Sequence, residues 1–258
     1  LCARTHHACR FGTVAWVRTA PNGPFPPSQY RFEPVKLQFE RAVSHAQNQR
    51  YFPFTMIRVA LVSYFNTRPF TDGLQHWFGE DELTLTEVPP SECAAQLKAG
   101  LCDMALMPVG ALVDFEGITL MKDHCLGADG RVDSVFLFSH VPVKHATALV
   151  LDPHSRSSNG LAAVLMNEYW NREIPVILPV GERFSQIQGT VCGVAIGDKA
   201  FAAKDQYPYV YDLAEVWKRY SGLPFVFAVW AYRPDALSSS VLERLRTALD
   251  WGRLHRQK

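Results

Sequence analysis

Short apolar runs alternate with helix-like segments from residue 56 onward. The run MIRVALVS at 56–63 is continuous and rich in β-branched residues, as in a strand buried on both faces. We expect further strands at 83–88, 102–107, 135–139, 148–151, 191–196 and 224–231, and helices at 66–78, 89–98, 155–169, 212–220 and 238–249. Strands that alternate with helices at this spacing predict βαβ units and an α/β fold with mostly parallel sheets flanked by helices.

The first 55 residues do not share this periodicity. Five prolines fall between residues 21 and 34, and only 35–50 has a helical pattern. We therefore interpret Met56 as the biological start and expect residues 1–55 to be upstream sequence or a disordered extension. A family-specific N-terminal arm is the alternative.

Charge divides the chain at the same place. Residues 1–55 carry seven Arg or Lys and two Glu, a net of +5, whereas residues 56–258 carry 19 basic and 23 acidic residues, a net of −4. Because residues 56–258 are mildly acidic overall, they lack the basic surface expected of a nucleic-acid-binding protein. No stretch approaches the roughly 20 consecutive apolar residues of a membrane-spanning helix, so we expect no membrane partner.

Six cysteines are scattered along the chain without C-x-x-C spacing, which argues against a zinc site. Such cysteines are typical of buried, reduced thiols in a cytosolic protein. No secretory signal is visible at the start of the sequence. We therefore predict a cytoplasmic protein.

Polar residues follow three of the predicted strands, at 63–67, 152–160 and 197–198. Ligands of open α/β sheets lie at the carboxyl ends of strands, where helix N-termini offer N–H groups. The middle segment is the most suggestive, because three serines and Arg156 at a helix start could bind a carboxylate or phosphate. Each signal also has an ordinary reading: the serines and Asp198 could merely cap helices, and Asn66 could be a turn residue. His154 could be a base or an exposed loop residue, and Trp230 a core or hinge residue.

Taken together, these segments resemble the chorismate dehydratase family. VSYFNTRPF at 62–70 is similar to its V-S-Y-L-N-T-x-P-L opening, and LDPHSRSSNGL at 151–161 to its L-D-x-S-S-R-T-S-x-A-L element. CDMALMPVGAL at 102–112, DSVFLFS at 133–139 and VAIGDKAF at 194–201 resemble three further blocks. The most specific match is YVYDLAEVWKRYSGLPFVFAVWA at 209–231.

The resemblance implies a two-lobed fold of the periplasmic-binding-protein type 2 class. Residues 56–137 would form the first part of lobe I, residues 138–223 lobe II, and residues 224–258 the return to lobe I, with crossovers near 135–139 and 225–231. The family's chain continues beyond this point, so the end at LDWGRLHRQK resembles a truncation. It would leave apolar surface of the first lobe exposed.

The resemblance also implies a reaction: loss of water from chorismate to give 3-[(1-carboxyvinyl)oxy]benzoate in the futalosine route to menaquinone. No metal or organic cofactor is implied. Asn66 and Ser134 would contact the reacting part of the substrate. The implied substrate-binding residues are Ser63, Thr67, Ser155, Arg156, Ser157, Ser158 and Asp198.

Departures from the family pattern are small inside this region. His154 stands where the family usually has a small or polar residue, and Ser157 replaces a threonine. Two other functions remain open. One is 1,4-dihydroxy-6-naphthoate synthase, whose usual S-P-C-P-N-D-T-F opening is absent, and the other is a non-catalytic binding protein for a small anionic metabolite. The oligomeric state does not follow from the sequence.

Overall fold

The computed structural model describes residues 56–181 and 184–255. All described residues belong to one compact unit of the chain. The expectation that residues 1–55 are upstream or disordered sequence falls outside the described residues. Within the described part, no helix is long and apolar enough to cross a membrane.

One five-stranded sheet has the order β2-β1-β3-β10-β4. Its strands are β1 (Ile57–Val62), β2 (Leu83–Val88), β3 (Met104–Pro108), β4 (Thr119–Ala128) and β10 (Phe225–Tyr232). Strands β2 and β3 flank β1 in parallel, whereas β10 pairs antiparallel with both β3 and β4. This first sheet therefore combines a parallel half with an antiparallel half.

Helices α1 (Arg68–Trp77), α2 (Pro90–Lys98) and α6 (Ser239–Leu254) accompany the first sheet, with the short 3₁₀ segments η2 (Phe65–Thr67) and η3 (Val109–Asp114). A proline opens α1 and another opens α2, as expected at a helix start. Helices α1 and α6 approach at two glycines. A Cβ at Gly252 would lie 1.8 Å from the Pro69 carbonyl oxygen, and one at Gly73 would lie 2.1 Å from that of Ala248.

The second sheet has the order β7-β6-β8-β5-β9. Its strands are β5 (Val135–Ser139), β6 (Ala148–Val150), β7 (Val176–Ile177), β8 (Val191–Ile196) and β9 (Tyr209–Asp212). The helices are α3 (Ser157–Glu168), α4 (Gly197–Ala203) and α5 (Leu213–Ser221), with 3₁₀ segments η4 (Val143–His145), η5 (Phe184–Gln186) and η6 (Lys204–Gln206). The parallel half is β7-β6-β8, and β5 pairs antiparallel with β8 and β9.

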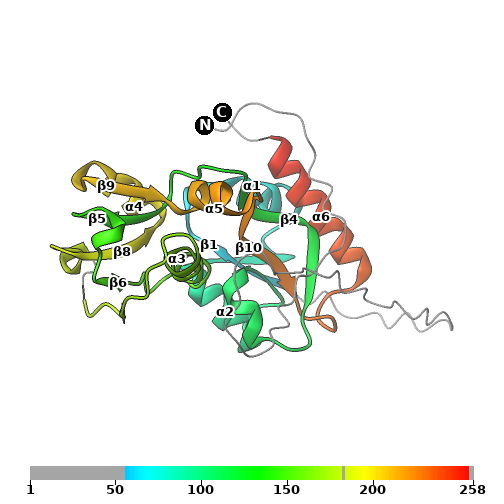
Figure 1. Cartoon of the computed structure of the whole chain (residues 1–258). Helices are drawn as coiled ribbons and strands as arrows, with labels where there is room; N and C mark the ends of the chain where they lie inside the picture. The colour runs from blue at the N-terminus through cyan, green and yellow to red at the C-terminus, as the bar shows by residue number, and fades with distance from the viewer. Residues whose placement is uncertain (1–55, 182–183, 256–258) are drawn as a thin grey trace. The chain divides into compact units, whose positions relative to one another are not determined.

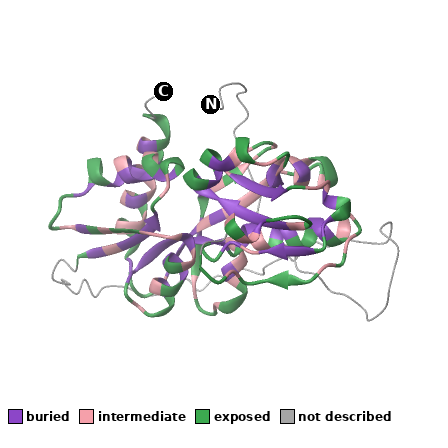
Figure 2. Ribbon diagram, turned by 90° about the vertical axis from the view of Figure 1, so that its left-hand side faces the viewer, coloured by how far each residue is buried: buried purple, intermediate pink, exposed green. Residues whose placement is uncertain are grey.

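Each sheet has its own apolar core, and buried residues follow the strands (Figure 2). Trp230 on β10 is fully buried in the first core, which confirms the core reading of this residue. Leu137 and Val194 lie in the second core. Tyr64 packs against both clusters, so it links the first sheet to the second.

The chain passes between the sheets twice, from β4 to β5 and from α5 to β10 (Figure 1). Both strands that receive the chain after such a passage, β5 and β10, enter their sheets antiparallel. The predicted two-lobed α/β class is confirmed, and the sheets are mixed because of these returning strands. The division into lobes at 137 and 223 stays a prediction, although all of β5 belongs to the second sheet.

Strand β4 was not predicted. Only Met121 and His124 of its ten residues are buried, so it shows neither a continuous apolar run nor a two-residue alternation. The expectation of buried cysteines was wrong at one position: Cys93, Cys102 and Cys192 are buried, but Cys125 on β4 is exposed.

Candidate functional site

A cavity of about 410 Å³ lies where the two sheets meet. The first sheet contributes the end of β1 at Val62, the end of β3 at Pro108 and the start of β10 at Phe227. The second sheet contributes the end of β8 at Ile196 and the start of β5 at Val135. The parallel strands β1, β3 and β8 thus present their carboxyl ends to the cavity, where ligands of α/β proteins bind.

Five of the residues predicted from the sequence line this cavity: Asn66, Ser134, Ser155, Ser157 and Ser158. They come from segments far apart in the chain and from both sheets. The side chains of Asn66 and Ser134 make no hydrogen bond to any residue that the structure describes. Both side chains are therefore available to a ligand.

The start of α3 is docked onto the first sheet through Ser157. Its hydroxyl donates to the Phe227 carbonyl at 2.7 Å and accepts from the Gly110 N–H at 3.2 Å. The approach is tight, since a Cβ on Gly110 would lie 3.0 Å from the Ser157 nitrogen. Ser155 caps the same helix start by accepting the Ser158 N–H at 3.1 Å. Ser155 and Ser157 therefore both fix the start of α3 and line the cavity.

Buried Asp152 holds this serine segment against β8. Its carboxylate accepts the His154 N–H at 2.9 Å and the Ile196 N–H at 3.0 Å. The Asn159 side chain accepts the Asp152 N–H at 2.9 Å and donates to the Asp152 carbonyl at 2.8 Å and to the Ser155 carbonyl. The aspartate directly after an apolar strand was the signal for this role, but sequence reasoning did not assign it.

Arg156 does not line the cavity. Its guanidinium pairs with Asp114 of η3, so the pair joins the start of α3 to the first sheet. The hydrogen bond from Arg156 holds the pKa of the Asp114 carboxyl below its usual value. Substrate binding by Arg156 stays a prediction.

Three other predicted residues lie outside the cavity lining. The buried Thr67 hydroxyl lies 2.6 Å from both the Val62 and Tyr64 carbonyl oxygens, and so fixes the turn that carries Asn66. Ser63 is exposed beside this turn, and Asp198 is exposed in the first turn of α4. Their roles in substrate binding also stay predictions.

Gly197 lines the cavity at the start of α4 and adopts a φ of +74°. Its N–H donates to the Ser134 carbonyl at 2.8 Å, which fixes the backbone beside that serine. A Cβ at this position would lie 3.0 Å from the Tyr64 ring. Both the left-handed backbone and the close ring require glycine here.

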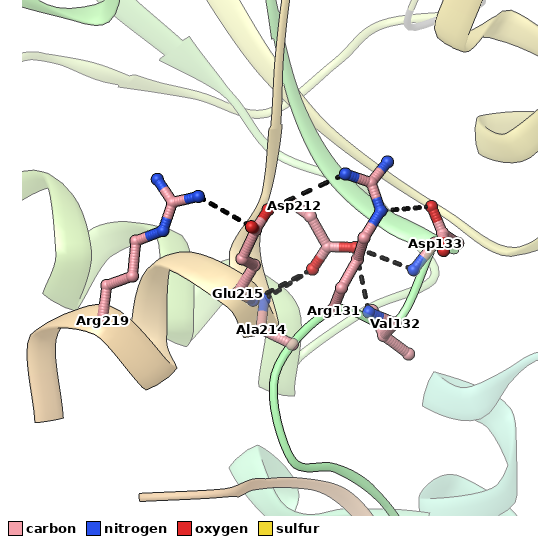
Figure 3. A network of polar contacts seen from close by, with 7 residues as sticks. All are labelled: Arg131, Val132, Asp133, Asp212, Ala214, Glu215 and Arg219. Carbon is pink, nitrogen blue, oxygen red and sulfur yellow. Dashed lines mark hydrogen bonds and ion pairs between the residues drawn. The ribbon is translucent and has the colours of Figure 1, made fainter. Parts of the chain in front are cut away.

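The segment before Ser134 is fixed by Asp212, the N-cap of α5 (Figure 3). One carboxylate oxygen accepts the N–H groups of Val132 at 3.0 Å and Asp133 at 2.7 Å. The other accepts those of Ala214 and Glu215, each at 3.1 Å. One buried carboxylate thereby joins the passage between the sheets to the start of α5.

Sequence reasoning missed the wall formed by β4 and α6. Asp123, His124 and Cys125 line the cavity from β4, and Arg253 lines it from α6. His124 is buried, and its Nε2 lies 3.3 Å from a carboxylate oxygen of Asp250. Without a predicted strand at β4, no signal placed these residues near Asn66.

No group of three or more His, Cys, Asp or Glu residues in the described ranges could hold a metal ion. Burial raises the pKa of the Cys93 and Cys192 thiols to about 12 and that of Cys102 to about 11. These three thiols therefore stay protonated near neutral pH and do not act as nucleophiles.

Solved structures place this architecture in a known fold class. Protein AF1704 from Archaeoglobus fulgidus aligns with a TM-score of 0.59 and 15% identity, covering 76% of this chain and 75% of that one. The Candida albicans CA3427 gene product, described as having the generic periplasmic binding protein fold, aligns with a TM-score of 0.53 and 11% identity, covering 77% and 70%. The fold, with its cavity between two sheets, is that of the periplasmic binding proteins.

Sequence comparison gives the family within this class. Residues 57–258 match the model of the menaquinone biosynthesis family, and the chain belongs to that family. The chain is also 29% identical over 225 residues to the chorismate dehydratase of Thermus thermophilus. That alignment covers 76% of this chain and 78% of the relative.

Proposed function

We propose that this protein is a chorismate dehydratase, a lyase that converts chorismate into 3-[(1-carboxyvinyl)oxy]benzoate and water. The observation that carries the proposal is the cavity of about 410 Å³ onto which Asn66, Ser134 and the α3 serines converge in a chain of the menaquinone biosynthesis family. This volume falls within the roughly 300–1,000 Å³ typical of small-molecule sites.

The start of α3 suits a carboxylate of the substrate. Ser155, Ser157 and Ser158 line the cavity beside the first N–H groups of a twelve-residue helix. Backbone N–H groups and the helix dipole favour a negative charge at this position. The Ser158 hydroxyl makes no hydrogen bond to a described residue, so it can donate to a bound oxygen.

Asn66 and Ser134 would hold the reacting part of the ring. The reaction removes the proton on the ring carbon that bears the enol-ether oxygen, together with the hydroxyl of the adjacent carbon. The electrons of the C–H bond form the new ring double bond as hydroxide leaves with a proton, and aromatisation drives the step. The protein orients the ring and stabilises the developing charge on the departing oxygen.

Neither Asn66 nor Ser134 is a base at neutral pH. We therefore assign proton removal to a carboxylate of the substrate, which the bound geometry would hold close to the ring carbon. Proximity of this kind can supply several kcal/mol of the barrier, up to about 7–11 in the best intramolecular cases.

The test is incubation of the purified protein with chorismate, followed by separation and mass measurement of the products. Conversion to a species lighter by one water, with an aromatic ultraviolet spectrum, supports the proposal. Binding of chorismate without conversion would instead support a metabolite-binding protein. If the protein shows no binding and no conversion of chorismate, chorismate is excluded as its ligand. The alternative function, that of 1,4-dihydroxy-6-naphthoate synthase, would then be the one to test.

A further inference from the structure

The cavity wall formed by α6 carries a charge that the α3 wall lacks. Arg253 is the single Arg or Lys among the cavity-lining residues of the described chain. Arg156, on the opposite wall, is paired with Asp114 and does not line the cavity. The acidic lining residue Asp123 is itself paired with Arg246 at 3.2 Å. The α6 wall therefore offers an anionic ligand its permanent cation.

Close helix packing brings Arg253 beside the turn that carries Asn66. The neighbouring Gly252 is buried against the start of α1, where a Cβ would lie 1.8 Å from the Pro69 carbonyl oxygen. Pro69 and Phe70 line the same cavity. The backbone of α6 at Arg253 is thus fixed next to the reacting end of the proposed site.

Asp250 holds Arg253 but leaves most of its donors unused. A carboxylate oxygen of Asp250 lies 3.2 Å from Arg253 Nη2, and the same oxygen lies 3.3 Å from His124 Nε2. The hydrogen bond from Nη2 to Asp250 uses one of the five N–H donors of Arg253. Among the described residues, no other group accepts a hydrogen bond from this guanidinium. The buried His124 ring on β4, which is 2% exposed, lies beside the Asp250 carboxylate.

We propose that Arg253 binds one of the two carboxylates of the substrate and that Asp250 is its positioning residue. This inference rests on the proposed function, because chorismate is a dianion and the α3 serines account for only one of its carboxylates. The guanidinium fork matches a carboxylate in shape and charge. Two anion sites on opposite walls would then select dicarboxylates of the right length.

The test compares Arg253→Ala and Arg253→Lys with Arg219→Ala. Arg219 is an exposed arginine of α5 paired within its helix to Glu215 at 2.7 Å, so it controls for loss of a charge and of an intrahelical ion pair. We expect Arg253→Ala to raise the KM for chorismate at least about tenfold with kcat within about threefold, because a charged hydrogen bond to the substrate is lost. The KM of Arg253→Lys should lie between those of the wild type and Arg253→Ala, and the KM of Arg219→Ala should match that of the wild type.

Calorimetric binding of 3-[(1-carboxyvinyl)oxy]benzoate separates this inference from the proposed function. If the wild-type protein binds this dicarboxylate without converting chorismate, the proposed function fails, and a Kd at least about tenfold weaker in Arg253→Ala still supports the arginine site. If the wild type converts chorismate and Arg253→Ala matches it in KM and Kd, the arginine site is wrong. Thermal unfolding of each variant verifies that it is folded.

Asp250→Asn tests the positioning role through a double-mutant cycle. Asp250→Asn should raise KM less than Arg253→Ala does, and it should add little in the Arg253→Ala background, since it acts through the arginine. If the effects of Asp250→Asn and Arg253→Ala on KM were fully additive in the double variant, this positioning role would be contradicted. An unchanged KM in Asp250→Asn alone would also contradict it.

Discussion

Asn66 and Ser134 meet at the cavity from opposite sheets, each on a backbone fixed by a neighbour. Buried Thr67 bonds the carbonyls of the turn beside Asn66. Gly197 donates its N–H to the carbonyl of Ser134. The backbone beside each residue is therefore fixed, while the polar atoms of the two side chains stay available to a ligand, as the proposed site requires.

Replacing Asn66 by alanine tests its proposed role directly. Loss of one preorganised donor at a developing charge lowers kcat by roughly 10²- to 10³-fold. We expect Asn66→Ala to show such a loss in initial rates with chorismate. Asn167→Ala, at an exposed asparagine of α3, should keep wild-type rates. Full turnover by Asn66→Ala would remove this residue from the mechanism.

The polar segments that follow predicted strands pointed to Asn66 and the three serines, whereas Ser134 followed from the family resemblance. Asn66, Ser134 and the three serines follow or precede apolar runs, and all five line the cavity. Arg253 could not be found in the same way, because its place depends on the packing of α6 against α1. Arg156 shows the reverse, since its ion pair with Asp114 is a long-range contact that local pattern does not specify.

Among the elements, the passage from β4 to β5 and the start of α5 share one anchor, Asp212 (Figure 3). Its carboxylate accepts four N–H groups and is 3% exposed. Those N–H groups would otherwise lack partners near the cavity.

Asp212→Ala should destabilise the protein by about 3 kcal/mol, because it removes a helix cap and leaves buried N–H groups unsatisfied. Urea unfolding measures the change. Asp212→Asn keeps one acceptor oxygen and should lose less. Asp205→Ala, at an exposed position of η6, should change stability by no more than about 0.5 kcal/mol. Equal stabilities for Asp212→Ala and Asp205→Ala would contradict the anchor role.

A second network lies at the end of the first sheet away from the cavity. The Asp103 carboxylate accepts from Arg58 Nη2 at 2.6 Å and from Arg233 Nη2 at 2.8 Å, and it also accepts the Arg58 N–H at 3.0 Å. Burial alone would raise the pKa of Asp103. The hydrogen bonds from both arginines outweigh burial and hold this pKa below its ordinary value of 3.8.

This lowered pKa predicts how stability depends on pH. A carboxyl with a depressed folded-state pKa stabilises the protein above its unfolded value and loses that contribution as the pH falls through the folded-state pKa. Asp103→Asn should therefore cost about 2 kcal/mol near pH 7 and progressively less below about pH 4. Urea unfolding at pH 7 and pH 3 measures both differences. A cost that stays constant or grows at pH 3 would contradict the assignment, and the KM for chorismate should not change.

Element prediction succeeded where an apolar or alternating strand pattern is visible in the sequence, and it failed where no such pattern is visible. The strands at 83–88, 135–139 and 191–196 lie where the pattern predicted them. Strand β4 was missed because eight of its ten residues are not buried. Its pairing with β10 holds it in the sheet, and pairing partners are not visible in a local pattern.

At the scale of the whole fold, two mixed sheets are joined by two passages of the chain (Figure 1). Both sheets contribute residues to the cavity. Contacts across it, such as the Ser157 hydroxyl on the Phe227 carbonyl, hold the α3 wall against the first sheet. The α/β class was predictable from the alternation of strands and helices, and the two-lobed form from the family resemblance. The antiparallel half of each sheet was not, because it depends on which sheet the returning strand joins.

We propose that chorismate is dehydrated in this cavity. The most direct measurement follows chorismate by proton nuclear magnetic resonance with the purified protein and with a protein-free control. We expect the ring signals of chorismate to be replaced by aromatic signals while the enol-ether vinyl protons remain, with one product molecule formed for each chorismate consumed. Chorismate signals that decay no faster than in the control would contradict it.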